Sequence, residues 1–420
     1  MRTRIKNASS RPLSTAVLLA GITATGIACH GRTAPVEGST ATTIPEEEAV
    51  EEPDEVAETP EEAEVGRVVE PPPEPREMFP DGLPMATPAT PEGLGGISAQ
   101  GCNACHSELH STWLSSGHAT GASNEGFLAA TRATNSDPAC TSCHLPMLVQ
   151  HPELMVEREA ELPAESTTSP NPHWSPTLQQ EGVTCAVCHI RDGEVLGVSE
   201  SERSPHPVVA EPALSQSQMC ATCHQHTVEG SEEPLYDTWG EWSRSGYPEV
   251  GLECQGCHMP QHAGATATGE VGVYASHASP ADGSRAVTLH VEGIAPRATR
   301  GQEYPFEIEL TNSGAGHALP TGSPFKALVV RATLLDGEGE PVADPFETLL
   351  QREVDENPPY ATLSDSRLKP RESVRWSGSV IPSFRSEPGW GALQVSVSLR
   401  HSDGREDPPL TIQNIPIGLD

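Results

Sequence analysis

The sequence has few aromatic residues, few basic residues and no long hydrophobic run. Phe, Trp and Tyr make up 4% of its 420 residues, and hydrophobic residues of all kinds make up 35%. Both fractions are low for a chain of this length, so side chains alone supply a sparse core. The 25 Lys and Arg residues are outnumbered by 59 Asp and Glu, which gives a formal net charge of −34. Such a surface excludes nucleic acid as a partner and favours basic proteins.

The longest apolar stretch, residues 13–28, is short and rich in Thr and Gly for a membrane span. With the basic residues before it and a small residue before Cys29, it predicts a signal peptide over residues 1–28. GIAC (26–29) resembles the lipoprotein box of bacteria, although Gly stands where the box normally has Leu. We therefore predict lipidation of Cys29, with plain secretion as the alternative. An acyl chain tethers a protein to a membrane surface without spanning it.

Residues 29–95 are predicted to be this anchor cysteine followed by a disordered linker. The stretch is rich in Glu, Pro, Thr and Ala, and in 46–77 alone 14 residues are acidic and 2 are basic. Like charges repel and prolines stiffen the chain, so the segment is expected to be extended. Its predicted role is a stalk between a membrane anchor and a folded domain.

Ten of the eleven cysteines form five C-x-x-C pairs, and each pair is followed directly by histidine. Zinc sites join such pairs two at a time, which leaves one pair over and does not explain the histidines. A thioredoxin-like centre uses a single pair, and a disulfide within a pair closes too small a loop to stabilise a fold. The five motifs are CNACH (102–106), CTSCH (140–144), CAVCH (185–189), CATCH (220–224) and CQGCH (254–258).

C-x-x-C-H is the attachment signal for haem c. The two thiols add to the haem vinyl groups, and the histidine that follows binds the iron. We therefore predict five covalently bound haems c, which replace part of the missing apolar core. The thioether cysteines are Cys102, Cys105, Cys140, Cys143, Cys185, Cys188, Cys220, Cys223, Cys254 and Cys257, and the proximal ligands are His106, His144, His189, His224 and His258.

Eight further histidines lie within residues 96–280, which is a large excess for a region of this size. A second histidine on each iron would use about five of them and would close that iron to substrate. The alternatives that stay open are surface positions for His226 and His262, and iron ligation by Met147, Met219 or Met259. The candidate distal ligands are His118 in WLSSGHA, His206 in SPHP, His277 in YASHASP and His173 in NPHWSP.

From residue 284 onwards the sequence changes to short alternating runs, and no cysteine follows Cys257. In YPFEIEL, for example, Phe306, Ile308 and Leu310 point one way, and this period of two predicts half-buried strands. About seven strands over 284–420 predict an antiparallel β-sandwich of immunoglobulin-like type. Residues 96–283 are predicted to be a mostly α-helical or irregular domain packed around haems.

Both regions contain motifs of a known family. WLSSGHA matches a W-x-x-S-x-H-A pattern, and with TWGEWSRSGYPEVGLECQGCHMP (238–260) it resembles multihaem c-type cytochromes. The loop TNSGAGHALPTGSP (311–324) resembles a G-H-x-x-P-T-G motif of β-domains attached to such cytochromes. There the histidine can reach a haem of the neighbouring domain. The resemblance implies that His317 is a distal ligand, and a turn whose histidine faces solvent is the alternative.

Two functions follow from this resemblance. The leading one is an electron-transfer protein, a pentahaem cytochrome that relays single electrons between redox protein partners at the bacterial cell envelope. The alternative is an oxidoreductase of the nitrite reductase or hydroxylamine oxidoreductase type with one open haem. Pentahaem nitrite reductases typically carry C-x-x-C-K at the catalytic haem, whereas all five motifs here end in His. Because haem c is attached after export, the resemblance implies the periplasmic side of the envelope, on an outer-membrane lipid anchor or at the cell surface.

Overall fold

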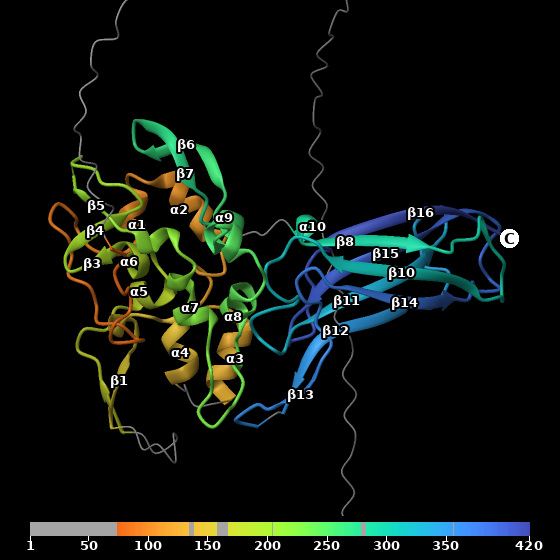
Figure 1. The fold of residues 1–420 in the computed structure, drawn as a ribbon, viewed down its shortest axis with the longest axis horizontal. Coiled ribbons are helices and arrows are strands. Elements are labelled where there is room, and N and C mark those ends of the chain that lie inside the picture. The colour runs from red at the N-terminus through yellow and green to blue at the C-terminus, as the bar shows by residue number, and fades with distance from the viewer. Residues whose placement is uncertain (1–73, 134–137, 158–166, 204, 279–282, 356) are drawn as a thin grey trace, which may run out of the picture. The chain divides into compact units, whose positions relative to one another are not determined.

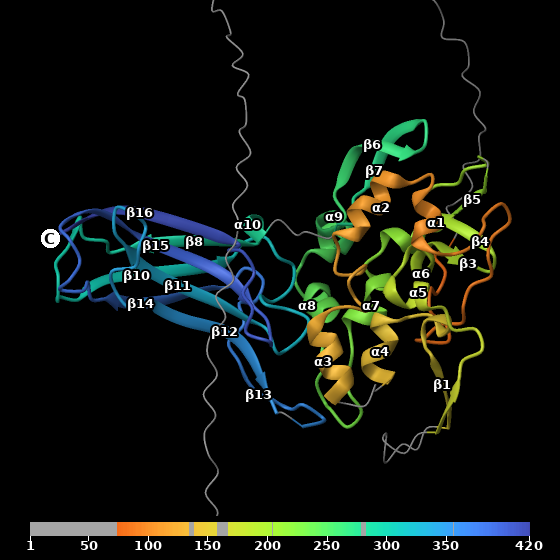
Figure 2. The same cartoon turned by 180° about the vertical axis from the view of Figure 1, so that it is seen from behind.

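The computed structural model describes residues 74–420 apart from 134–137, 158–166, 204, 279–282 and 356. The predicted signal peptide, Cys29 and most of the linker lie outside the described residues. Short helices and hairpins make up 74–278, and larger β-sheets make up most of 283–420 (Figures 1 and 2). Among the described helices, none is long and apolar enough to cross a membrane.

The motif region consists of short elements joined by irregular chain. Its strands form a β1–β2 hairpin, a β3–β4–β5 sheet and a β6–β7 hairpin. The helices are α1 (Ala99–Asn103), α2 (Ser107–Leu114), α3 (Glu125–Ala133), α4 (Pro138–His144), α5 (Pro176–Gln180), α6 (Cys185–His189), α7 (Gln218–His224), α8 (Thr238–Ser243) and α9 (Cys254–His258). The strands are β1 (Glu153–Glu157), β2 (Thr167–Pro170), β3 (Ile190–Arg191), β4 (Glu194–Gly197), β5 (Val208–Ala210), β6 (Gln261–Ala267) and β7 (Glu270–Ala275).

Buried apolar side chains of this region form three small clusters instead of one continuous core. A domain of this size ordinarily has one contiguous core. Separate clusters are the pattern expected where cofactors complete the interior, as the sequence predicts. The largest cluster consists of Met85, Ile97, Met147, Val149, Leu178, Ala186, Val187 and Ile190.

Residues 78–85, which fall inside the linker predicted over residues 29–95, contact the motif region. Met78 and Met85 are 5% and 8% exposed, and the backbone N–H of Met85 donates to Pro146 O at 2.7 Å. The reason is local composition, because 78–85 carries large apolar side chains that the preceding acidic stretch lacks. The last part of the predicted linker therefore packs against the motif region.

The C-terminal region contains two sheets around one core. One sheet has the order β14–β10–β8 and the other β13–β12–β11–β15–β16–β9, with every pairing antiparallel except β16 with β9. Buried residues of both sheets belong to a single cluster, which makes this region a two-layer β-structure. The strands are β8 (Val287–Glu292), β9 (Arg297–Ala298), β10 (Tyr304–Asn312), β11 (Ala327–Leu335), β12 (Phe346–Val354), β13 (Thr362–Asp365), β14 (Ser373–Val380), β15 (Gly389–Arg400) and β16 (Thr411–Leu419), and the one-turn helix α10 (Gly283–Ala286) precedes them.

The alternation of apolar residues is confirmed by burial. Phe306, Ile308 and Leu310 of β10 are 2%, 0% and 0% exposed, whereas the residues between them face outward. The structure has nine strands in this region, compared with the prediction of about seven. The two additional strands are the short β9 and β13, which lie at the two ends of the six-stranded sheet. The immunoglobulin-like topology remains a prediction.

Candidate haem-binding sites

The five motifs lie on single turns of helix. Four of them fall wholly within α4, α6, α7 and α9, and the first runs from α1 to the start of α2. Residues three and four apart lie on the same side of a helix. The two cysteines and the histidine of one motif can therefore approach the same flat ligand. One macrocycle held by two thioethers and one imidazole requires this local geometry.

Four of the five motif histidines lie opposite a second histidine that is distant in sequence. In each pair the two rings are separated by a similar distance between centroids, and their planes are inclined by 21° to 59°. The pairs are His106 with His206 at 6.2 Å, His224 with His118 at 6.4 Å, His189 with His277 at 6.0 Å, and His258 with His317 at 6.1 Å.

These separations match the spacing of two imidazoles on one metal ion. A metal–imidazole bond is about 2.0–2.1 Å long, which places two opposite nitrogens about 4 Å apart and the ring centroids about 6 Å apart. Haem iron needs only these two ligands from the protein. In the described part of the chain, no group of three or more His, Cys, Asp or Glu side chains could hold a bare metal ion. The pairs thus fit an iron that already has four ring nitrogens.

Backbone carbonyls orient several of these rings. The Nδ1 atom of His106 bonds Thr266 O at 2.7 Å, and that of His189 bonds Leu196 O at 2.8 Å. A hydrogen bond at Nδ1 leaves Nε2 free for a metal and fixes the direction of the ring. The same arrangement holds for His144 with Gly121 O at 2.8 Å, for His277 with Ala275 O at 2.9 Å and for His317 with Ala318 O at 3.0 Å.

The environment of the paired rings favours neutral imidazole. Desolvation by the surrounding chain, with a smaller contribution from the paired ring, lowers the pKa of His224 and of His277 to about 4 in each case. Neutral imidazole is the form that binds metals. His118 and His224 nevertheless keep accessible surface. Both rings are therefore close to other parts of the chain and still reachable by a ligand, which binding to a haem iron would require.

One buried nitrogen in these pairs has no hydrogen-bond partner. Nδ1 of His206 is one of three such side-chain atoms in the described ranges, and its ring belongs to the pair with His106. Buried polar atoms are nearly always satisfied, so an orphan of this kind needs an explanation. A bound group that brings a hydrogen-bonding atom next to this ring would account for it.

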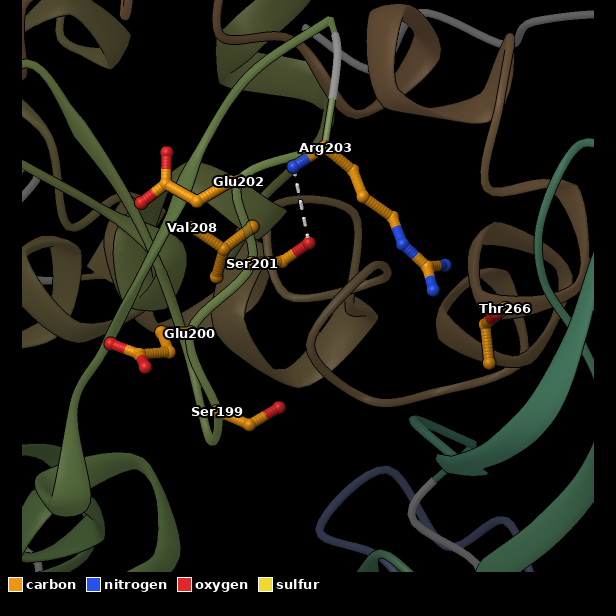
Figure 3. A pocket seen from close by; sticks show the side chains of 7 residues that line it. All are labelled: Ser199, Glu200, Ser201, Glu202, Arg203, Val208 and Thr266. Atoms are coloured by element: carbon orange, nitrogen blue, oxygen red, sulfur yellow. Dashed lines mark hydrogen bonds between the residues drawn. The ribbon is translucent and has the colours of Figure 1, made fainter.

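A polar surface depression of about 590 Å³ lies near this part of the chain (Figure 3), and it is lined by Ser199, Glu200, Ser201, Glu202, Arg203, Val208 and Thr266 but by neither histidine of the first pair. Thr266, whose carbonyl holds His106, lies on one side, and Arg203 extends across the space from the segment that leads to His206. Arg203 also pairs with Glu270 at 2.6 Å.

The remaining motif histidine, His144 of the second motif, has a different neighbour. The Phe127 ring from α3 stacks flat on its imidazole, with centroids 4.2 Å apart and planes 3° apart. A ring stacked face to face lies beside the imidazole and not at the end-on position of a second ligand. Phenylalanine also has no donor atom. Within the described residues, His144 is the one motif histidine without a histidine opposite.

The remaining predicted ligands are not brought to a motif histidine. His173 is exposed, and its backbone N–H donates to Asn171 Oδ1 at 3.0 Å. Met147 is fully buried in the largest apolar cluster of the motif region. The rings of His226 and His262 lie beside Tyr236 and Tyr274. Ligation by His173 remains a prediction, as does ligation by any of the others.

Contacts between motifs link their helices. The Glu181 carboxylate accepts from the Ala99 N–H at the start of α1 and from Thr184 Oγ1 just before α6, at 2.9 and 2.8 Å, so the first and third motifs are adjacent. The Cys102 and Cys185 thiols are hydrogen-bonded to each other, and this bond lowers the pKa of Cys102.

The fourth motif is adjacent to the fifth and to the second. Buried Ser217, which precedes α7, accepts from the Cys254 N–H through Oγ at 2.7 Å and donates its own N–H to Glu253 at 2.8 Å. A hydrogen bond from Cys220 lowers the pKa of Cys254 to about 7, and one from Cys223 lowers the pKa of Cys143 to about 7. Thioether formation would remove these thiol protons.

Reasoning from sequence missed three residues near these sites, namely Phe127, Glu241 and Lys326. Lys326 lies close enough to His224 to contribute to its lowered pKa, although the chain separates them by about a hundred residues. Glu241 falls inside the segment 238–260 that resembles multihaem cytochromes, so the motif contained a signal for it. The other two are isolated in sequence, and no local pattern marks them.

Similarity to known proteins is found at the level of fold. No family model and no curated protein matches the sequence. The CARDB domain of the PF1109 protein from Pyrococcus furiosus and the C-terminal domain of wzt each match 32% of this chain and 87% and 74% of their own, at 12% and 11% identity. Their TM-scores of 0.19 and 0.21 are too low to indicate a shared fold. A penta-haem cytochrome c552 from Thermochromatium tepidum matches over 78% of this chain and 100% of its own, at 17% identity and a TM-score of 0.52, so this chain is similar in fold to that cytochrome.

Proposed function

We propose that this protein is an electron-transfer protein that holds five covalently attached haems c and relays single electrons between redox partners. The observation that carries the proposal is the set of four imidazole pairs, each with one motif histidine, at centroid separations of 6.0–6.4 Å. Two imidazoles on one iron leave no position for substrate, which suits electron transfer. The similarity in fold to a penta-haem cytochrome supports the same proposal.

The arrangement of the motifs supports a continuous relay. Hydrogen bonds join the first motif to the third and the fourth to the fifth, and the Cys143 thiol of the second motif is close enough to Cys223 of the fourth to interact with it. Cys188 of the third motif lies within electrostatic reach of Cys220 and Cys223 of the fourth. All five attachment sites therefore form one connected set with the fourth motif at its centre.

The chain has a defined part in this function. Bound haem supplies a one-electron iron couple. The motif cysteines would hold each haem covalently, the paired histidines would bind its iron, and backbone carbonyls accept hydrogen bonds from Nδ1 of His106, His144, His189, His277 and His317. Partly buried side chains between the motifs keep the attachment sites in fixed positions, so that little rearrangement accompanies each electron.

The proposal includes the cell envelope as the place of action, with support from the sequence alone. A lipid on Cys29 would anchor the chain, and the acidic stalk would let the folded part reach its partners. The formal net charge of −34 favours basic partners through electrostatic steering. This attraction is screened by salt, with a Debye length of about 10 Å at 0.1 M.

A reductive titration of the purified protein tests the relay. We expect five haems per chain by pyridine haemochromogen assay and an uptake of five electrons per chain. We also expect rapid oxidation by a small basic redox protein, at a rate that falls as salt rises. Fewer than five covalent haems would contradict the assignment of the motifs. Haems that fail to exchange electrons with any soluble partner would contradict the relay.

A second candidate function, an oxidoreductase with one open haem, is favoured by His144 alone. Its flat face is covered by Phe127, and no described histidine lies opposite. An iron there would have an open position for a small ligand such as nitrite or hydroxylamine. The absence of lysine from all five motifs separates this candidate from the usual pentahaem nitrite reductases.

Low-temperature EPR with and without cyanide separates the two functions. If His144 has no opposite ligand, we expect four low-spin haems and one high-spin haem, and cyanide should convert only the high-spin one. Turnover of nitrite or hydroxylamine with a reduced dye would then establish the enzyme. Five low-spin haems that do not respond to cyanide would exclude it and leave the electron carrier.

A further inference from the structure

The fifth motif takes its opposite histidine from the β-sheet region. His258 ends α9, whereas His317 lies in the loop between β10 and β11. A ligand that arrives on a loop of another region can bind iron firmly only if that loop is held in place. Contacts on both sides of this loop show how it is held.

Glu241 of α8 binds the loop directly beside His317. Its Oε2 accepts from the backbone N–H of Ala318 at 3.1 Å and from Thr321 Oγ1 at 2.8 Å. Its Oε1 accepts from Arg367 Nη1 at 2.7 Å. The Glu241 and Arg367 side chains are 9% and 12% exposed. A carboxylate at this depth is stable when it is paired and fully hydrogen-bonded, as it is here.

The chain that follows Glu241 contacts the first half of the same loop. The Tyr247 hydroxyl donates to Gly314 O at 3.3 Å. A Cβ atom on Gly316 would lie 3.1 Å from the Trp242 ring and 3.2 Å from the Tyr247 ring, so the two rings pack closely against the bare backbone. Trp242 Nε1 also donates to Leu252 O at 3.1 Å, two residues before α9. One segment thus contacts both the ligand loop and the approach to the motif.

The β-sheet region holds the loop from its own side. Asn312, fully buried at the end of β10, donates from Nδ2 to His317 O at 2.9 Å and to Leu368 O at 3.1 Å. Its Oδ1 accepts from the Ala315 N–H at 3.0 Å. The loop therefore cannot shift toward or away from α9 without breaking bonds at one end or the other.

We propose that Glu241 is a positioning residue that sets His317 on the iron of the fifth haem, so that the β-sheet region donates an essential ligand to the cytochrome. The inference rests on the proposed function, because it requires haem at the fifth motif. The negative charge and both oxygens matter, since three donors converge on them. A glutamine has one acceptor oxygen and one NH₂ group. Its NH₂ group would therefore face another donor, either Arg367 or the N–H of Ala318 and the hydroxyl of Thr321.

The test compares Glu241→Gln with Asp365→Asn in the full-length holoprotein. Asp365 binds the other side of the same arginine, Nη2 to Oδ2 at 2.8 Å, so its variant removes a carboxylate from Arg367 and leaves the bonds between Glu241 and the loop intact. Loss of a group that orients a metal ligand typically costs about 10–100-fold in affinity. We expect cyanide to reach the fifth haem of Glu241→Gln at a concentration about 10–100-fold lower than in Asp365→Asn.

His317→Ala provides the reference, and EPR provides the readout. The His317→Ala protein should show one more cyanide-responsive, high-spin haem than the wild type. The cyanide midpoint of Glu241→Asp should fall between those of Glu241→Gln and the wild type. Equal cyanide midpoints for Glu241→Gln and Asp365→Asn would overturn the inference, as would a His317→Ala protein with an unchanged spectrum. A wild-type protein with fewer than five covalent haems would instead contradict the proposed function.

Discussion

Replacement of both Cys185 and Cys188 by alanine is expected to leave four covalent haems per chain and very little folded protein. The third motif lies deepest of the five, because Ala186, Val187 and Ile190 are 0%, 3% and 3% exposed within the largest apolar cluster of the region. Truncation of one buried Leu or Ile to Ala costs about 2–5 kcal/mol. A missing haem removes far more contact, and the whole stability of a domain is only about 5–15 kcal/mol.

The matched control is the first motif, with Cys102 and Cys105 both replaced by alanine. Cys105 is exposed, so this site lies nearer the surface. We expect that variant to lose one haem as well but to remain folded. The haemochromogen assay counts haems, and the yield and thermal unfolding of the two variants measure stability. A Cys185/Cys188 variant that keeps five acid-resistant haems, or that is as stable as the control, would contradict the prediction.

Replacement of His118 by alanine is expected to convert one low-spin haem to a high-spin haem that binds cyanide. His118 lies opposite His224, at the motif that contacts the second and fifth motifs. The backbone carbonyl of His118 accepts from the Val183 N–H at 3.0 Å, and this bond survives the substitution. The haem also remains attached through its two cysteines. The fold should therefore be kept while electron transfer through the central site is slowed.

His173→Ala serves as the control for this experiment, because its ring is exposed and lies opposite no motif histidine in the described chain. EPR and stopped-flow reduction are to be recorded for both variants. An unchanged spectrum for His118→Ala would show that the pair with His224 does not share an iron. A change for His173→Ala would support the sequence-based prediction that it is a ligand.

Several features of the site could be predicted from the sequence because they are local. A C-x-x-C-H motif occupies a single helical turn, so five consecutive residues suffice to identify each attachment site. The alternation in β10 likewise follows from the two faces of a strand, and it predicted the buried Phe306, Ile308 and Leu310. His118, His206, His277 and His317 could be nominated from the short motifs around them.

The pairing of these histidines could not be predicted, because it depends on how distant segments pack. His118 follows the first motif and yet lies opposite the fourth motif's His224, whereas His206 precedes the fourth motif and lies opposite the first motif's His106. The packing of residues 78–85 against the motif region has the same cause. Met78 and Met85 are buried only because residues far along the sequence cover them.

The sequence by itself determined the number and chemistry of the candidate haem sites, the sign of the charge and the presence of a separate β-sheet region. Each of these depends on residue type or on spacing along a few residues. Only the tertiary structure decided which two imidazoles lie opposite each other, that His144 has Phe127 beside it, and that Glu241 and Arg367 hold the loop of His317. These features depend on contacts between segments that no local pattern links, since packing sets the positions of ligands that come from different elements.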